Sequence, residues 1–395
     1  QFAQDALLKE QITLMDSESE NCPNCPGNKL VKYGKRRSDY HDVLTDHKLT
    51  IGRKRCPQCH YEPGSTIKNI LGDSMSGDLI RLQSELGASY TYRESERLFS
   101  TFARVKRYIN NHDRIKHTAE DVGSQMRKLH QTETEVVCRE EAKELIINVD
   151  GGHINTNEEG KRSFEAMTAV IYRPESLVSN KDGTRNTLIS KHCAASALND
   201  SQQQMITDTI IAALKQGLSP QTRITALCDG AENCWKIAKS LEPLAASMVC
   251  ILDWFHVSMK IQNIALPDAL KPKLLLIKWH LWRGKVGNAI TRLTSLIESC
   301  PKTYKLRLEK LKTYIENNCD KIVDYRERQK QGLVFTSNLA ESTVESLINQ
   351  RCKGQQHMRW SREGLDPLLQ LRAAIFSNDW NKMWRTAVIN SITKY

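Results

Sequence analysis

Residues 144–153 read ELIINVDGGH, an apolar run that ends in Asp150 and is followed by two glycines. Short apolar runs bounded by turn-forming residues are typical of buried β-strands. The same pattern returns at Ile224–Cys228, which is followed by Asp229 and another glycine. The sequence therefore predicts an α/β sheet in which two strands carry an acidic residue at their carboxyl ends.

The runs around these two strands predict the rest of the sheet. Further strands are expected at Ala166–Tyr172, Thr187–Ser196 and Met248–Leu252, with a helix at Gln203–Gln216. Three hairpin-like strands followed by helix, strand, helix and strand suit a ribonuclease H-like sheet. Ligands gather at the carboxyl ends of strands in such sheets, so Asp150 and Asp229 are expected to share a metal site. A single strand-end Asp is more often a turn former or helix cap, but two in matching Asp-Gly contexts favour a site.

A third acid is expected far along the chain. After the strand at Met248–Leu252 comes Asp253-Trp254-Phe255-His256, and residues 260–328 then have an almost wholly helical pattern that resembles an insertion. A new helix capped at Ser337 or Asn338 follows and carries Glu341 in its first turn. Glu345 lies at i+4 on the same face and is the rival third carboxylate.

The amino-terminal part carries two C-x-x-C units separated by about thirty residues. Their cysteines are Cys22, Cys25, Cys56 and Cys59. Two matching units predict a structural zinc ribbon with short strands such as Lys48–Arg53 between them, and the alternative is a redox pair. His41, His47 and His60 are spare ligands, for which a solvated or core position is the preferred interpretation.

Three short helices are predicted after the ribbon, at residues 76–86, 92–100 and 102–111, with breaks at 87–89 and 100–101. This spacing suggests a helix-turn-helix. The third helix would offer Arg104, Lys106 and Arg107 to DNA phosphates or bases. The alternative is a helical linker with a solvated basic face.

The composition limits the class of protein. The 395 residues are 39% hydrophobic and 26% charged, which excludes a disordered or collagen-like chain. No apolar stretch approaches the roughly 18 residues of a membrane span, and residues 1–5 have neither the basic nor the apolar region expected of a signal peptide. The chain starts without Met and can be a fragment. The formal net charge of +11 favours a polyanionic partner, most commonly nucleic acid. The eight unpaired cysteines favour a reducing, cytosolic compartment.

From residue 22 to about residue 378, the order of these motifs resembles the bacterial insertion-sequence transposases of the DDE class, and most closely the ISKra-type group. The most specific segments are Met358–Gly364 (MRWSREG) and Leu368–Ala374 (LLQLRAA), which follow the NLAES motif at 338–342. Asn338 stands where a Gly is common in that family.

The resemblance implies a ribonuclease H-like core in which Asp150, Asp229 and Glu341 hold two Mg²⁺ or Mn²⁺ ions. Hard carboxylate oxygens suit these ions, and in-line attack on a phosphodiester uses two of them. It also implies DNA transposition on double-stranded element ends and target DNA, by a homodimer or larger assembly associated with the bacterial nucleoid in the cytoplasm. The alternatives are a catalytically inactive, transposase-derived DNA-binding protein and an unrelated ribonuclease H-like nuclease.

Further residues have two interpretations each. Asp253 and His256 match a family Asp-x-x-His pair that acts near the scissile strand, or they form a buried pair that positions the next helix. Trp360 stacks on an unpaired base or, as preferred, packs in the core. The basic residues near the third acid hold phosphates or form a solvated face; they are Arg351, Lys353, Arg359, Arg362 and Arg372.

The expected domains follow from these motifs. They are a zinc ribbon at 1–70, a helix-turn-helix region at 71–140, the first part of the catalytic core at 141–259, an all-helical insertion at 260–335, and the carboxy-terminal helices of the core at 336–395.

Overall fold

The computed structural model describes most of the chain. The described residues are 2–17, 20–63, 73–102, 108–132, 140–179, 186–337, 343, 345–353 and 358–386. They form two compact units: residues 1–129 with 379–395, and residues 130–378. Within these described ranges, no helix has the length and apolar character needed to cross a membrane.

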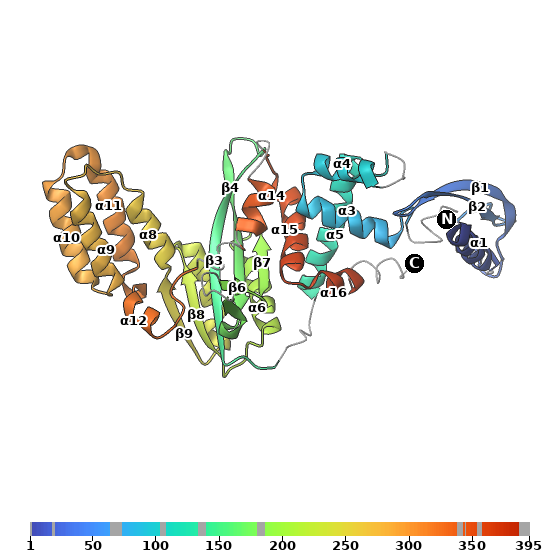
Figure 1. Ribbon diagram of the computed structural model, residues 1–395. Coiled ribbons are helices and arrows are strands. Elements are labelled where there is room, and N and C mark those ends of the chain that lie inside the picture. Colours follow the sequence, from blue (N-terminus) through green and yellow to red (C-terminus); the bar gives the residue numbers. More distant parts are fainter. Residues whose placement is uncertain are drawn as a thin grey trace. The chain divides into compact units, whose positions relative to one another are not determined.

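The first unit begins with a helix and a long β-hairpin (Figure 1). These are α1 (Phe2–Ser17), β1 (Val31–His41) and β2 (Asp46–Arg55). The strands pair antiparallel, and Ile12 of α1 packs on the buried Leu49 and Ile51 of β2. The strand expected at Lys48–Arg53 is confirmed, and α1 is a helix that the sequence analysis did not identify.

Helices complete the first unit. They are α3 (Gly77–Ser89), α4 (Tyr92–Phe102), the first part of α5 (His112–Thr132), and α16 (Trp380–Trp384). The predicted break at residues 100–101 is wrong, because both residues lie inside α4. The hydroxyls of Ser100 and Thr101 donate to the Arg97 carbonyl in the preceding turn at 2.7 and 3.0 Å. The predicted third helix falls on 103–107, outside the described residues, and on 108–111, which form turns.

The second unit is built on a five-stranded mixed sheet of order β7-β4-β3-β8-β9. Its strands are β7 (His192–Ser196), β4 (Ser163–Tyr172), β3 (Glu144–Asn155), β8 (Arg223–Cys228) and β9 (Ser247–Leu252). β4 runs antiparallel to β3 and β7, whereas β8 and β9 run parallel to β3. Residues 145–149 are all buried, as a central strand covered on both faces requires.

The strand predicted at Thr187–Ser196 is two strands in different sheets. The first, β6 (Asn186–Leu188), pairs with β5 (Leu177–Ser179) in a small separate ribbon. The chain turns at residues 189–191, where the Ile189 N–H bonds the Ser176 carbonyl at 3.0 Å, and only β7 enters the main sheet. The predicted strand is therefore interrupted by a local turn, which is hydrogen-bonded to the last residue of the 3₁₀ helix Pro174–Ser176.

Helices cover the sheet and lengthen the unit. α6 (Gln203–Lys215) and α15 (Arg362–Phe376) pack on β7, and α7 (Glu232–Lys239) packs on β3. Gln370 of α15 donates to the Ala195 carbonyl at 2.9 Å, and Asp366 accepts from the Ala197 N–H at 3.0 Å. α15 is therefore fixed to the end of β7 by buried polar contacts as well as by apolar packing.

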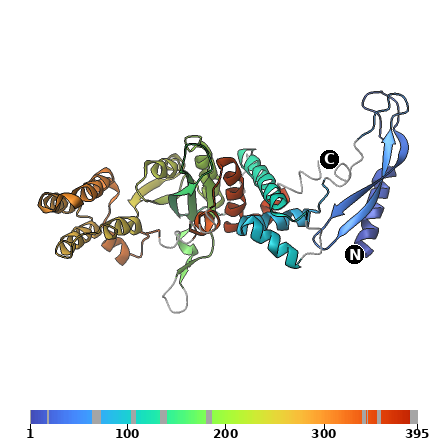
Figure 2. The ribbon, with the colours of Figure 1, turned by 90° about the horizontal axis from the view of Figure 1, so that it is seen from above.

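The region between β9 and residue 337 is helical, as its sequence pattern predicts. It contains α8 (Trp254–Gln262), α9 (Lys271–Trp282), α10 (Val286–Ser299), α11 (Lys302–Asn317) and α12 (Tyr325–Lys330). Figures 1 and 2 show α9, α10 and α11 as a bundle beyond the β9 edge of the sheet. Trp254, Trp282 and Tyr325 form its aromatic base, with Trp254 4.8 Å from each of the other two rings.

Candidate functional site

Three aspartates lie in one row across neighbouring parallel strands, directly after the ends of β8 and β9 but within β3. The prediction that the first strand ends at Asp150 is wrong, because β3 stays paired with β4 as far as Asn155. Val149 of β3 pairs with Cys228 of β8, and Cys228 pairs with Leu252 of β9. Each of these residues is followed directly by an aspartate: Asp150, Asp229 and Asp253. Because the strands are parallel and in register, the three carboxylates emerge at one edge of the sheet.

Asp150 is partly buried in the row, and its surroundings make its charge costly. Burial raises the pKa of its carboxyl above the usual value, and the charge of Asp229 acts in the same direction. The charges of His256 and Lys353 act against this increase in pKa, and the Gly151 N–H donates to Asp150 Oδ1 at 2.8 Å. A buried carboxylate beside a second acid is a donor set suited to a cation.

Asp229 is held by its own turn and by the helical insertion. Its Oδ1 accepts the Ala231 N–H at 2.9 Å, and its backbone carbonyl accepts the Tyr314 hydroxyl of α11 at 2.8 Å. Gly230 has φ +99°, and a Cβ there would lie 2.8 Å from the Tyr314 ring. The glycine after Asp229 is therefore required both by the backbone conformation and by the close approach of α11.

Asp253 is saturated with hydrogen bonds and has only 1% of its side chain exposed. Oδ1 accepts the N–H groups of Phe255 and Ser337 at 3.2 and 2.8 Å, and Oδ2 accepts from Ser337 Oγ at 2.7 Å and pairs with His256 Nδ1 at 2.6 Å. Burial works to raise the pKa of Asp253, but the bonds from His256 and Ser337 outweigh it and hold the pKa below its usual value. Asp253 is therefore a structural carboxylate that caps α8 and fixes Ser337.

His256 is positioned by this bond and faces the row. Nδ1 is bonded to Asp253, the side chain is 23% exposed, and its charge acts on Asp150. The two interpretations of the Asp-x-x-His pair therefore divide between its members: Asp253 has the buried positioning role, and His256 lies at the edge where Asp150 and Asp229 emerge.

The third acid falls partly outside the structure. Glu341 lies outside the described residues, as do Arg104, Lys106 and Arg107. Its rival Glu345 is exposed at the start of a π-helical turn, Glu345–Asn349, and accepts a hydrogen bond from the Asn349 side chain.

The π-helical turn at 345–349 is held by Arg372 of α15. This buried guanidinium donates to the carbonyls of Leu347, at 2.6 Å from Nε, and Ser346. Burial lowers the pKa of Arg372 to about 10. Arg372 therefore supports the chain just after the proposed third acid and is not available to bind phosphates.

Trp360 packs in the core, as preferred from the sequence. It is 8% exposed, and its Nε1 donates to the Cys352 carbonyl at 3.3 Å. Arg351 is also buried, and its guanidinium lies 5.1 Å from the centre of the Trp360 ring. These two side chains therefore stabilise the segment around 351–360.

The other basic residues near this segment differ in exposure. Arg362 donates to the Ala197 carbonyl at 2.6 Å and covers the Phe164 ring at 4.5 Å, so it has packing partners. Lys353 and Arg359 are exposed. Lys353 Nζ would lie 3.3 Å from a Cβ built on Gly152, two residues after Asp150, so its ammonium reaches the acidic row.

The four predicted zinc ligands come together at one end of the hairpin. Their sulfur atoms all lie within 4.8 Å of one another, and Cys22 Sγ is 3.5 Å from Cys59 Sγ. Tetrahedral zinc with Zn–S bonds of about 2.3 Å needs sulfurs roughly 3.8 Å apart, so the group fits a structural metal such as zinc. Among the described residues, it is the only group of three or more His, Cys, Asp or Glu at this spacing.

Each cysteine pair is shaped by backbone turns. The Cys22 N–H donates to the Asn28 carbonyl at 2.8 Å, and the Cys56 N–H donates to the Tyr61 carbonyl at 2.8 Å. The spare histidines have the positions preferred from the sequence. His41 and His47 are buried, where His41 pairs with Asp46 and His47 pairs with both Asp5 and Asp42. His60 is exposed.

Some residues of the acidic edge were missed from the sequence. Ser337 was identified only as a helix cap, and its use of both N–H and hydroxyl on Asp253 has no local signal. Tyr314 lies in an ordinary amphipathic helix. Glu165 of β4 approaches Gly151, where a Cβ would lie 2.5 Å from its Oε1, and accepts from Asn233 Nδ2 at 3.0 Å. These contacts join segments far apart in sequence.

A known protein family matches the whole of the second unit and part of the first. Residues 85–386 match the family described as Uncharacterised protein family (UPF0236). The chain belongs to this family. No curated protein matches the sequence. The match to UPF0236 includes the whole acidic row and begins after the four cysteines, so the cysteine cluster lies outside the part that the family shares.

Proposed function

We propose that this protein is a metal-dependent DNA transposase whose catalytic carboxylates are Asp150, Asp229 and Glu341. The observation that carries the proposal is the in-register placement of Asp150 and Asp229 on adjacent parallel strands, with the charge of one acting on the other. The strand order β7-β4-β3-β8-β9, with only β4 antiparallel to its neighbours, is the order expected of a ribonuclease H-like core and supports the same proposal.

The bonds of Ser337 support the choice of Glu341. Ser337 is fixed to Asp253 in the same row, through both its N–H and its hydroxyl. Glu341 follows four residues later, so the chain enters this segment next to Asp150 and Asp229. Glu345 is eight residues from the anchor and is already bonded to Asn349. Glu341 is therefore the better third carboxylate.

The proposed roles follow from the charges at the edge. Asp150, Asp229 and Glu341 would hold divalent ions, which supply activation of the attacking hydroxyl and stabilisation of the leaving oxygen. Lys353 and His256 flank Asp150, and each carries a donor suited to a phosphate oxygen. Asp253 keeps the His256 ring oriented through Nδ1.

The experiment is nicking of supercoiled plasmid by the full chain with Mg²⁺ or Mn²⁺. Asp150→Asn, Asp229→Asn and Glu341→Gln should each abolish metal-dependent nicking, whereas Glu345→Gln and the surface change Asp268→Asn should retain it. Nicking that survives Asp150→Asn and Asp229→Asn would refute the site. Loss with Glu345→Gln but not Glu341→Gln would move the third carboxylate. DNA binding without any nicking would favour the inactive, transposase-derived DNA-binding protein.

A further inference from the structure

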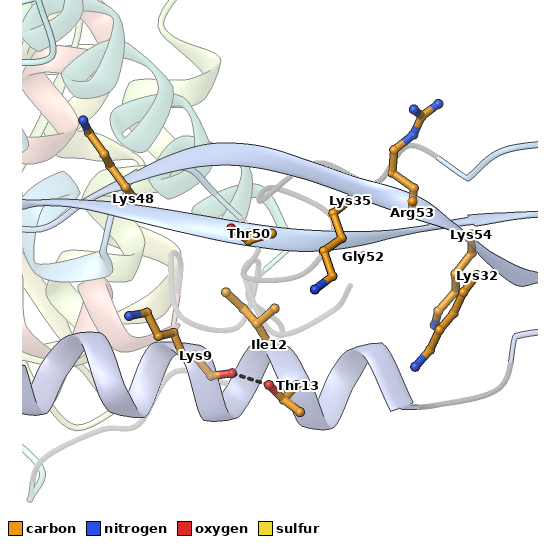
Figure 3. A pocket seen from close by; sticks show the side chains of 11 residues that line it. Lys9, Ile12, Thr13, Lys32, Lys35, Lys48, Thr50, Gly52, Arg53 and Lys54 are labelled. Atoms are coloured by element: carbon orange, nitrogen blue, oxygen red, sulfur yellow. Dashed lines mark hydrogen bonds between the residues drawn. The ribbon is translucent and has the colours of Figure 1, made fainter.

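A basic groove lies in the first unit between α1 and the β-hairpin (Figure 3). Its volume is about 520 Å³. Six cationic side chains line it and no acidic one does; they are Lys9, Lys32, Lys35, Lys48, Arg53 and Lys54. The groove is distinct from the cysteine cluster and is not explained by it.

The hairpin register gathers lysines on one side of the groove. Lys32 pairs with Lys54 and Lys35 with Gly52, so the irregularity between Lys32 and Lys35 leaves both on the same face of the strand. Figure 3 shows Lys32, Lys35 and Lys54 extending toward α1, from which Lys9 rises. Gly34, with φ +89°, lies in the irregular step and lines the groove.

This arrangement costs stability unless an anion binds. Lys32 and Lys54 are directly opposed like charges, a pairing that destabilises a two-stranded ribbon. Lys54 is partly compensated by Glu20 at 3.3 Å, and Arg53 by Glu62 at 2.5 Å. Lys9, Lys32 and Lys35 are exposed and have no ion pair with any described residue. These three cations line the groove without an ion pair to any described residue, an arrangement suited to phosphate groups.

We infer that this groove binds one phosphodiester strand of double-stranded DNA, without reading its sequence. The lining contains lysines, the Thr50 hydroxyl and glycine backbone, all suited to phosphate oxygens. It contains no aromatic ring on which an unpaired base could stack, which argues against a single strand. Tyr33 lies between Lys32 and Gly34 in the sequence, and the Arg55 guanidinium already covers its ring at 4.6 Å. The inference rests on the proposed function in one respect only, which is that the double helix in the groove is DNA.

The test is fluorescence anisotropy of the full-length protein with a short duplex of arbitrary sequence, without Mg²⁺, over a series of salt concentrations. The logarithm of the association constant falls linearly with the logarithm of the salt concentration, and each lost phosphate contact lowers the magnitude of this slope by about 1. Lys32→Gln with Lys35→Gln should therefore lower the slope by about 2. The matched control is Arg36→Gln with Arg37→Gln, which removes equal charge from the same exposed strand outside the groove and should leave the slope nearly unchanged.

An equal loss of slope in the Arg36 and Arg37 control would show diffuse electrostatic attraction and would overturn the assignment to the groove. An unchanged slope in the Lys32 and Lys35 variant would also overturn it. Tighter binding of a single strand of the same sequence would overturn the assignment to duplex. The assay contains no Mg²⁺, so it measures the groove independently of the proposed carboxylate chemistry. A failed nicking experiment with the groove result intact would thus refute the proposed chemistry and not the groove.

Discussion

Replacing Asp253 with Asn tests whether the third aspartate of the row is structural. The substitution keeps the shape of the side chain, and the amide oxygen can still accept the two backbone N–H groups now bonded to Oδ1. The amide nitrogen replaces Oδ2, which accepts from Ser337 Oγ at 2.7 Å and pairs with His256 Nδ1 at 2.6 Å. Two buried charge-assisted hydrogen bonds are therefore lost or reversed.

Each such bond contributes about 1.5–3 kcal/mol, and rotation of the hydroxyl and a change of His256 tautomer recover part of the loss. We expect Asp253→Asn to lower the stability of the second unit by about 3 kcal/mol, or roughly 6–12 °C in Tm for a unit of this size. The control is Asp268→Asn, whose carboxylate is 93% exposed and pairs only with Lys271 at 2.6 Å. Its effect should stay below about 0.5 kcal/mol, as for other surface pairs.

The pH dependence gives the sign of the effect. The folded-state pKa of Asp253 is lowered, so its contribution is fully present above the unfolded-state pKa of about 3.9 and is lost as the pH falls through the folded value. The difference in Tm between wild type and Asp253→Asn should be constant near neutral pH and narrow in acid. A variant that melts with the wild-type protein at pH 7 would refute the anchoring role of Asp253.

Three further outcomes are expected. Cys56→Ser should release the bound metal and unfold the hairpin end, because a structural zinc site supplies much of the folding free energy of so small a unit; full zinc content by atomic absorption would contradict this. Asp150→Asn should raise Tm in metal-free buffer by the equivalent of about 0.5–2 kcal/mol, because it removes a carboxylate that burial and Asp229 make costly to ionise, and a lower Tm would contradict a functional site. Gly230→Ala should cost roughly 2–4 kcal/mol, since φ is +99° and the Cβ meets Tyr314, whereas Gly160→Ala, with φ +74° and nothing within 4 Å of its Cβ, should cost less in the same melting experiment.

The sheet was predictable where its strands carry a buried apolar run. Residues 145–149 and 224–228 were identified from local pattern because both are apolar runs covered on two faces. The continuation of β3 from Asp150 to Asn155 was missed, because the two glycines after Asp150 suggest a turn. The strand at 187–196 was misread because the turn at 189–191 depends on a backbone bond to Ser176, which no apolar pattern encodes. α1 escaped notice because only Ile12 of its described side chains is buried, so its apolar stripe is too narrow to stand out.

The site was predictable to the extent that residue type and strand ends determine it. Cys22, Cys25, Cys56 and Cys59 were found because two tight turns of known spacing suffice to bring them together. The different uses of Asp150 and Asp253 were not readable, because both come directly after a buried apolar run in the sequence. The difference comes from Ser337, which lies 84 residues beyond Asp253 and satisfies both of its oxygens.

The saturation of Asp253 also explains why the proposed site takes its third carboxylate from another segment. A carboxylate that accepts four hydrogen bonds and is 1% exposed has no lone pair directed at a ligand, although it stands in register with Asp150 and Asp229. Its bonds instead hold two other parts of the edge: the His256 ring beside Asp150, and Ser337 at the start of the segment that carries Glu341. One residue of the row is thus used to position the chain, and in the proposed site the third carboxylate would come from the segment that it anchors.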